Sequence, residues 1–255
     1  MHWPARRVRT VRTYRHSPDS PACLRSCGRT GSLGSVERRR ITDPGGSPNA
    51  RTVESYEEIA ADYARETTGD RVLASGLTRL VEAVPAGHVL EIGSGPGWDA
   101  DALEEAGLKV RRTDITQAFL DFQRARGKQV ERLDAINDDL GGPYDAVVTL
   151  HVLQHVEPSD LSAVLAKVAG ALRPGGSFLV SIPLGESVGW EVGESGTPYY
   201  RALWSEADFT VALREVDLEP EWTQRSVEHE ESGWLCVLAR SQETSAPAAG
   251  QLFNH

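Results

Sequence analysis

Methionine, lysine and cysteine are scarce in this chain of 255 residues, which holds one methionine, three cysteines and three lysines beside 24 arginines. No apolar run approaches the roughly 20 residues of a membrane-spanning helix, which excludes an integral helical membrane protein. So few cysteines exclude a disulfide scaffold and indicate a reducing compartment, so we expect a cytoplasmic protein. An apolar content of 40% and a charged content of 25% are typical of a globular domain.

Charge divides the chain into a basic head and an acidic body. Residues 1–40 contain ten arginines and two acids, so they carry +8 of a net charge of −10, and the remainder carries −18. An acidic body repels phosphate backbones, which excludes nucleic acid as the expected partner.

The head has little apolar periodicity, so we expect residues 1–52 to form a disordered, arginine-rich extension. It has three interpretations: a transit peptide, a nucleic-acid-binding arm, or translated sequence upstream of the true start. We favour the third, with Val36 or Val53 as the initiator. The Cys23–Cys27 pair lacks the further ligands that an iron–sulfur or zinc site needs, so we interpret it as two incidental thiols.

From Val53 onward, strand and helix patterns alternate, which predicts a parallel sheet covered on both faces by helices. We expect this domain to span 53–240, with a flexible tail at 241–255. Helical spacing recurs at 53–65 and 73–84. The predicted strands and helices that follow are 88–92, 98–106, 108–113, 116–126, 129–133, 144–150, 161–172 and 177–182.

After Pro183 the alternation stops. We expect a long loop over 184–204 that serves as a lid. A helix should follow, capped by Ser205 with Asp208 in a capping box. Two closing strands are predicted near Glu219–Arg225 and Trp234–Ala239.

A glycine-rich turn lies between the predicted strand 88–92 and the helix after it. The segment Glu91-Ile-Gly93-Ser-Gly95-Pro-Gly97 lets the backbone approach a ligand at a helix N-terminus. Its G-x-G-x-G spacing differs from the dinucleotide pattern G-x-G-x-x-G, and no lysine follows it as in a P-loop. An acid two residues before the first glycine suits a ligand with an ammonium group, such as S-adenosylmethionine.

Residues 53–239 resemble the class I S-adenosylmethionine-dependent methyltransferases, in particular the small-molecule branch near the ubiquinone-biosynthesis enzymes. The landmarks are the E-x-G-x-G-x-G loop, Asp114, Asp134 and Leu-Arg-Pro-Gly-Gly at 172–176, all in order, together with the helix of Tyr56 and Tyr63. The resemblance implies a Rossmann-like, seven-stranded, mostly parallel sheet with a closing antiparallel strand, and S-adenosyl-L-methionine as cofactor.

The resemblance also implies the cofactor site. Asp114 should accept from both ribose hydroxyls and Asp134 from the adenine amino group. The full expected set is Tyr56, Tyr63, Glu91, Gly93, Gly95, Gly97, Asp114, Ile115, Asp134, Ala135 and Leu150. The residues leave alternatives open: Asp134 fits a solvated acidic loop as well, and Tyr56 and Tyr63 fit an ordinary helix core.

His151 and His155 are the candidate catalytic bases, since they follow the fourth predicted strand at the carboxyl edge, where ligands bind. Their spacing would place both rings on one face of a helix. The alternative for His155 is a turn cap that hydrogen-bonds backbone. Some relatives bind magnesium here through E-x-x-E-H, but His151 and Gln154 replace those carboxylates, so we expect no metal.

Aromatic and basic side chains in the segment 184–204 are the candidate acceptor-binding residues, because they offer stacking faces and a carboxylate-binding guanidinium. They are Trp190, Tyr199, Tyr200, Arg201 and Trp204. The alternative for Trp204 is packing against the sheet.

Methylation of a small metabolite is the favoured function, with oxygen slightly ahead of nitrogen as the methylated atom, in a monomer or homodimer. The sequence leaves three others open: methylation of a peptide or protein end group, a non-catalytic S-adenosylmethionine-binding module, and an NAD-dependent reductase.

Overall fold

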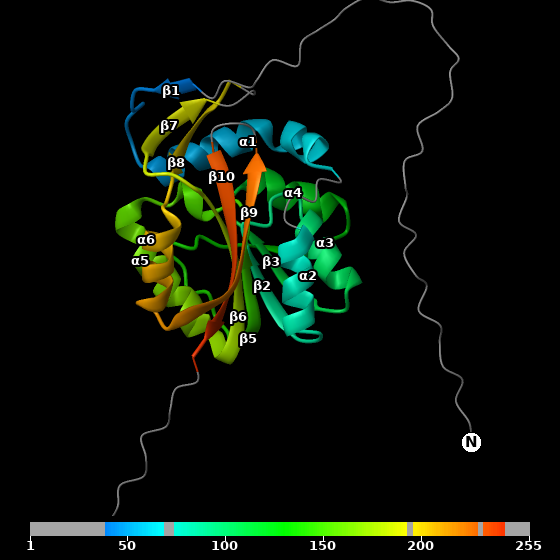
Figure 1. The fold of residues 1–255 in the computed structure, drawn as a ribbon. Helices are drawn as coiled ribbons and strands as arrows, with labels where there is room; N and C mark the ends of the chain where they lie inside the picture. Colours follow the sequence, from blue (N-terminus) through cyan, green and yellow to red (C-terminus); the bar gives the residue numbers. More distant parts are fainter. Residues whose placement is uncertain (1–38, 69–73, 193–195, 229–231, 243–255) are drawn as a thin grey trace, which may run out of the picture. The chain divides into compact units, whose positions relative to one another are not determined.

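The computed structural model describes residues 39–68, 74–192, 196–228 and 232–242 (Figure 1). They all lie within one unit, Ser35–His255. The head up to residue 38, with Cys23 and Cys27, and the tail from 243 lie outside the described residues.

The main sheet has seven strands in the order β4-β3-β2-β5-β6-β10-β9. Strand β10 runs antiparallel to both of its neighbours, β6 and β9, and the other pairs of neighbours in the described sheet are parallel. The expected seven-stranded, mostly parallel sheet is therefore confirmed. The strands are β2 (His88–Ile92), β3 (Lys109–Asp114), β4 (Val130–Arg132), β5 (Tyr144–Thr149), β6 (Leu172–Pro183), β9 (Leu218–Glu228) and β10 (Ser232–Ser241).

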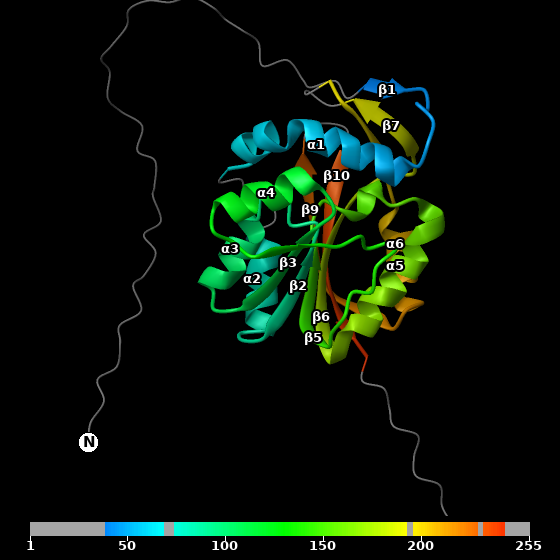
Figure 2. The ribbon, with the colours of Figure 1, turned by 180° about the vertical axis from the view of Figure 1, so that it is seen from behind.

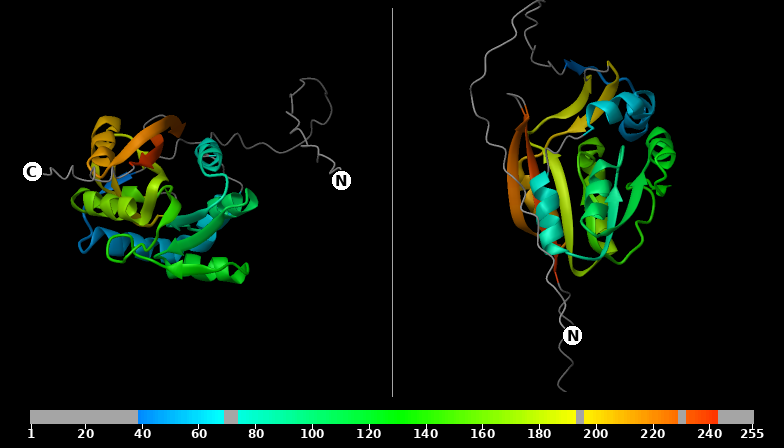
Figure 3. Two further views of the ribbon diagram at one scale, coloured as in Figure 1. Left: turned by 90° about the horizontal axis from the view of Figure 1, so that it is seen from below. Right: turned by 90° about the vertical axis from the view of Figure 1, so that its right-hand side faces the viewer.

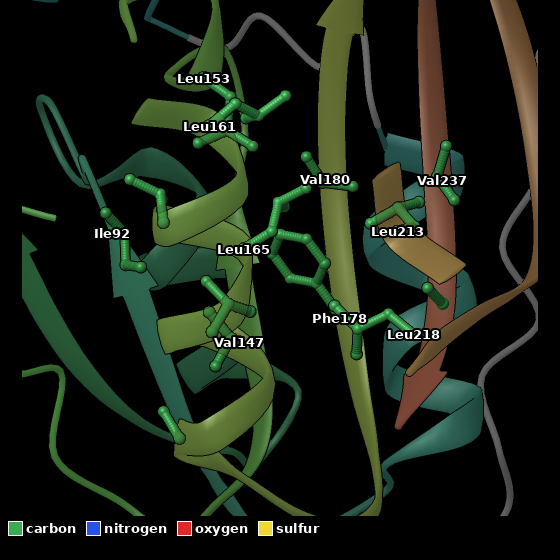
Figure 4. Close-up of a cluster of buried hydrophobic side chains, with 14 of the residues drawn as sticks. Ile92, Val147, Leu153, Leu161, Leu165, Phe178, Val180, Leu213, Leu218 and Val237 are labelled. Atoms are coloured by element: carbon green, nitrogen blue, oxygen red, sulfur yellow. The ribbon is translucent and has the colours of Figure 1, made fainter. Parts of the chain in front are cut away.

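Helices cover both faces of this sheet, as the alternating pattern predicts. Figure 4 shows one core, where Leu165 of α5 and Leu213 of α6 pack against Phe178 and Val180 of β6. The opposite face buries Leu80 of α2 and other apolar side chains of α2 and α3. The helices are α2 (Ala74–Ala83), α3 (Trp98–Glu105), α4 (Gln117–Ala125), α5 (Pro158–Ala171) and α6 (Glu206–Arg214).

Most predicted elements are confirmed within a few residues. Ser205 caps α6 as expected: its hydroxyl accepts from the Asp208 backbone N–H at 3.0 Å and donates to the Asp208 carboxylate at 2.7 Å. Within the described ranges, no helix is both long and apolar enough to cross a membrane.

The expected loop over 184–204 is wrong, because it forms a β-hairpin. Strands β7 (Val188–Val192) and β8 (Pro198–Ala202) pair antiparallel, and β1 (Arg39–Ile41) adds a third strand beside β7. Trp190, Tyr200 and Ala202 fill a small core of their own, with Ile41 against it. Residues 39–52, which we expected to be disordered, therefore include a strand and the start of a helix.

Helix α1 (Pro48–Glu66) lies across the carboxyl edge of the main sheet (Figures 1 and 2). Figure 3 shows α1 and the small sheet at the same end of the molecule. The Glu57 carboxylate accepts from the first backbone N–H groups of α4, those of Gln117 and Ala118. On the other side, the Tyr200 N–H donates to the Thr52 hydroxyl at 3.0 Å. These contacts fix α1 as a roof over the strand ends.

Candidate functional site

A cavity opens at the carboxyl ends of β2, β3 and β5, beneath α1. It holds about 790 Å³ of space that protein atoms do not fill, including the solvent at its mouth. The fold brings several of the predicted cofactor-site and catalytic residues together here. Its lining consists of Asn49, Thr52, Val53, Tyr56, Tyr63, Ile92, Gly93, Gly95, Asp114, Ile115, Thr116, Phe119, Leu133, Asp134, Ala135, Ile136, Leu150, His151, Val152, His155 and Val156.

The glycine-rich turn forms one wall of the cavity. Gly93, Gly95 and Gly97 have φ values of 69°, 51° and 85°, a left-handed region that side chains rarely adopt. A Cβ on Gly93 would meet the Val152 side chain at 2.5 Å, whereas one on Gly95 would meet nothing within 4 Å. Gly95 therefore leaves open space at the cavity wall, where a ligand can approach the backbone.

Asp114 ends β3 at the centre of the cavity. One carboxylate oxygen accepts from the Gly95 N–H at 2.7 Å and the other from the Thr116 N–H at 2.8 Å. Burial raises the pKa of Asp114, and the backbone donors act against that rise. Each carboxylate oxygen accepts two hydrogen bonds, so Asp114 retains capacity for a ligand diol.

Glu91 lies behind the loop rather than on the cavity surface. It is 3% exposed, and among the described residues its Oε2 atom has no hydrogen-bond partner. Burial, reinforced by nearby Asp99, raises the pKa of Glu91 to about 8. A cationic group bound at the loop would favour its ionised form.

Asp134 borders the other end of the cavity with Ala135 and Ile115. Its oxygens accept from the Ile136 N–H at 2.9 Å and from the Asn137 side-chain amide at 2.8 Å. Asp134 therefore also organises its own turn, and its adenine contact stays a prediction.

His155 is the best-positioned basic group at the cavity. Its Nδ1–H donates to the Tyr200 carbonyl at 2.7 Å, which leaves the lone pair on Nε2. The Tyr56 hydroxyl lies 3.1 Å from Nε2 and donates to it. Burial lowers the pKa of His155 to about 4, so the ring is neutral at physiological pH.

Tyr56 joins this histidine to an aromatic cluster with Tyr63 and Phe119, whose ring centroids lie 5.7 Å and 6.0 Å from its own. Burial raises the pKa of Tyr56 well above its usual value, so its hydroxyl stays protonated. Tyr56 and Tyr63 thus both line the cavity and pack against α4.

His151 also reaches the cavity, but not on a shared helical face with His155. Its backbone has φ 60°, and only a short 3₁₀ turn, η1 (Leu153–His155), follows. The His151 ring packs instead against Trp234, with centroids 4.2 Å apart. The expectation of one helical face is wrong because the chain turns sharply directly after β5.

The candidate acceptor residues lie outside the cavity lining. Trp190 and Tyr200 are buried in the core of the hairpin, and Trp204 packs against the main core. Arg201 is 3% exposed and pairs with Glu191 at 3.3 Å. Tyr199 has its ring centroid 6.0 Å from that of His155, and Tyr200 reaches the site through its backbone carbonyl. The hairpin thus holds His155 through the Tyr200 carbonyl, and its role as a lid stays a prediction.

Sequence reasoning missed the start of α1 as part of the site. Asn49 and Thr52 line the cavity although they fall in the segment expected to be disordered, and Val53, the first residue of the expected domain, lines it beside them. Pro48 at the first helical turn was the available signal, because proline favours that position.

No group of three or more histidine, cysteine, aspartate or glutamate side chains within the described ranges is arranged to hold a metal ion.

Residues 90–178 match the family model described as methyltransferase domain. Over these residues, the chain is similar to methyltransferase domains. The match starts in β2, ends in β6 and includes the glycine-rich turn, Asp114 and Asp134.

Known proteins resemble the domain in sequence and in fold. A ubiquinone biosynthesis O-methyltransferase of Xylella fastidiosa is 33% identical over 102 residues, 37% of this chain and 41% of that protein. The chain therefore spans about two fifths of this relative's length. Two solved structures share the fold of the methyltransferase domain at low identity.

One is the 1,6-didemethyltoxoflavin-N1-methyltransferase of Burkholderia thailandensis with S-adenosylhomocysteine. It has a TM-score of 0.65 and 19% identity, and the match covers 82% of this chain and 97% of that chain. The other is a DhpI–SAH complex, with a TM-score of 0.62, 22% identity, and coverage of 77% and 98%.

The cavity fits S-adenosylmethionine, the cofactor that the sequence resemblance implies. Asp114 suits a ribose diol, the open space at Gly95 suits a close ligand, and the buried, unpartnered oxygen of Glu91 suits a nearby ammonium group.

Proposed function

We propose that this chain is an S-adenosylmethionine-dependent methyltransferase of a small-molecule acceptor, with oxygen favoured over nitrogen as the methylated atom. The observation that carries the proposal is a single cavity lined both by the cofactor residues and by His155. The roof that α1 forms over this cavity favours a compact acceptor over a peptide.

The bound cofactor supplies an electrophilic methyl group, so the protein has to position the acceptor and remove its proton. His155 presents Nε2 toward Tyr56, and the Tyr200 carbonyl fixes that tautomer. An acceptor O–H next to Tyr56 gives its proton to the Tyr56 oxygen while the Tyr56 proton passes to Nε2. This proton relay through Tyr56 and His155 would leave the acceptor oxygen ready to take the methyl group that a bound cofactor would supply.

The low pKa of His155 restricts the acceptor. A base with a pKa of about 4 takes a proton effectively only from an acidic group. This favours a phenol or another acidic hydroxyl over an aliphatic alcohol.

His155→Gln should lower kcat for a phenolic acceptor by about 100-fold, at the low end for general-base catalysis because of the mismatched pKa. The assay is transfer of labelled methyl groups to a panel of phenols and amines. The wild-type rate should rise with pH through about 4 and stay level from 6 to 8, since His155 is already neutral there.

His88→Gln is the matched control, because His88 is exposed at the opposite end of β2. Equal rates for His155→Gln and wild type would refute the base assignment. Tight S-adenosylhomocysteine binding without transfer to any acceptor would favour a non-catalytic binding module.

A further inference from the structure

Three successive carbonyls of the glycine-rich turn each accept a hydrogen bond from a different side chain. Gln123 Nε2 donates to the Gly95 carbonyl at 2.8 Å, and Arg126 Nη1 donates to that of Pro96 at 2.8 Å. Arg112 Nη1 donates to the Gly97 carbonyl at 3.2 Å. None of the three donors is among the residues that line the cavity, so they hold the turn from the side that faces away from it.

The donors are themselves fixed. Gln123 is fully buried on α4, and its side-chain oxygen accepts from Arg112 at 3.3 Å. The guanidinium of Arg126 lies 4.2 Å from the centre of the Trp98 ring and pairs with Asp101. The turn is therefore tied to α3 and α4 through side chains with little freedom.

A planar peptide unit turns as a whole, so a fixed carbonyl also fixes the N–H of the next residue. Two peptide units of the turn, at Gly97 and Trp98, thus have fixed N–H directions. The Gly95 N–H is set separately by Asp114. Backbone hydrogen bonds from the Gly97 N–H to the Ser94 carbonyl and from the Asp101 N–H to the Gly97 carbonyl also hold the turn, at 2.8 Å and 3.0 Å. The side-chain donors add to this order. Three left-handed glycines give the backbone more freedom without them, and ordering the turn on binding would then weaken affinity.

We propose that Gln123 and Arg126, together called the clamp, are positioning residues. They hold the glycine-rich turn, which is the cofactor loop, in its binding conformation before the cofactor arrives. The inference rests on the proposed function in one respect, that this loop binds S-adenosylmethionine. It extends the site to side chains that touch no ligand.

The test compares Gln123→Met and Arg126→Met with Gln117→Met and Arg124→Met. The control residues lie on α4, which also carries Gln123 and ends directly before Arg126. They are exposed and contact Asp121 instead of the turn. Calorimetry with S-adenosylhomocysteine, well below the melting temperature, should show a Kd about tenfold weaker for each of the two clamp variants. That factor corresponds to one lost hydrogen bond to a carbonyl that stays partly buried. The controls should bind within about twofold of wild type.

Hydrogen exchange of the Gly95–Trp98 segment in the free protein gives a second readout that a loss of global stability alone would not produce. Exchange should accelerate in the clamp variants, relative to the rest of the domain, and not in the controls. Unchanged affinity or unchanged loop exchange in both clamp variants would overturn the proposal. Failure of wild type to bind S-adenosylhomocysteine would instead count against the proposed function, and the exchange comparison would still decide whether the clamp orders the loop.

Discussion

Arg112→Met should lower the free energy of unfolding by about 3 kcal/mol, within the range typical of removing one partner from a buried ion pair. The Arg112 side chain is 1% exposed and pairs with Asp101 at 2.6 Å and with Glu104 at 2.7 Å. Its loss also removes the donor to the Gly97 carbonyl. Asp101 keeps Arg126 and Lys128 as partners, which holds the loss at the lower end of that range.

Urea denaturation of both proteins measures this loss. Arg79→Met is the control, because Arg79 forms an exposed ion pair with Glu82 and should change the free energy by less than about 0.5 kcal/mol. Similar losses in the two variants would contradict the role of the buried network.

The same network makes the free energy of unfolding depend on pH in acid. Burial acts to raise the pKa of Asp101, but hydrogen bonds from Lys128, Arg112 and Arg126 outweigh it and hold the pKa at about 2. The folded pKa lies below the ordinary value of 3.8, so the stabilisation is complete above pH 4. It is lost as pH falls through about 2.

Asp114→Ala should weaken S-adenosylhomocysteine binding by about 1–3 kcal/mol, which is roughly 5- to 150-fold in Kd. The substitution removes the acceptor expected for the ribose hydroxyls. It also leaves the Gly95 and Thr116 N–H groups without their carboxylate, so the loop loses its own support. Both effects act on the same site and in the same direction.

Calorimetry again provides the measurement, with Asp121→Ala as control because Asp121 is exposed on α4, where it accepts hydrogen bonds from Gln117 and Arg124. An affinity for Asp114→Ala equal to that of the control would refute the ribose assignment.

The gathering of several expected cofactor residues at one cavity could be predicted from sequence because these residues follow strand ends. In a parallel sheet the carboxyl ends meet at one edge, so Gly93, Asp114, Asp134 and Leu150 had to lie near one another once their strands were assigned. The structure places all four on one cavity.

The acceptor half could not be predicted in the same way. Trp190 and Tyr200 are ten residues apart in sequence but form a cross-strand pair, with ring centroids 6.0 Å apart. Gly189 and the charged residues between them obscured the strand alternation, so aromatic residues that fill a small core were interpreted as ligand contacts. The partner strand β1 lies some 150 residues earlier, beyond the reach of local patterns.

The supporting clamp was missed for a related reason. Arg112 lies in a strand that we expected helices to bury on both faces of the sheet. A charged side chain at such a position needs a partner of opposite charge. Its partners come from α3 and α4, and only the packed structure shows that Gln123 and Arg126 reach the same turn.

The most direct test of the central claim is a thermal-shift titration of the purified full chain with S-adenosylhomocysteine, with NAD, and without ligand. At a concentration 100-fold above Kd, a ligand that binds only the folded protein adds about 2.7 kcal/mol to its stability, which shifts Tm by several degrees. The structure predicts a shift with S-adenosylhomocysteine and none with NAD. A shift with NAD alone would contradict the proposed S-adenosylmethionine site and would support the alternative of an NAD-dependent reductase.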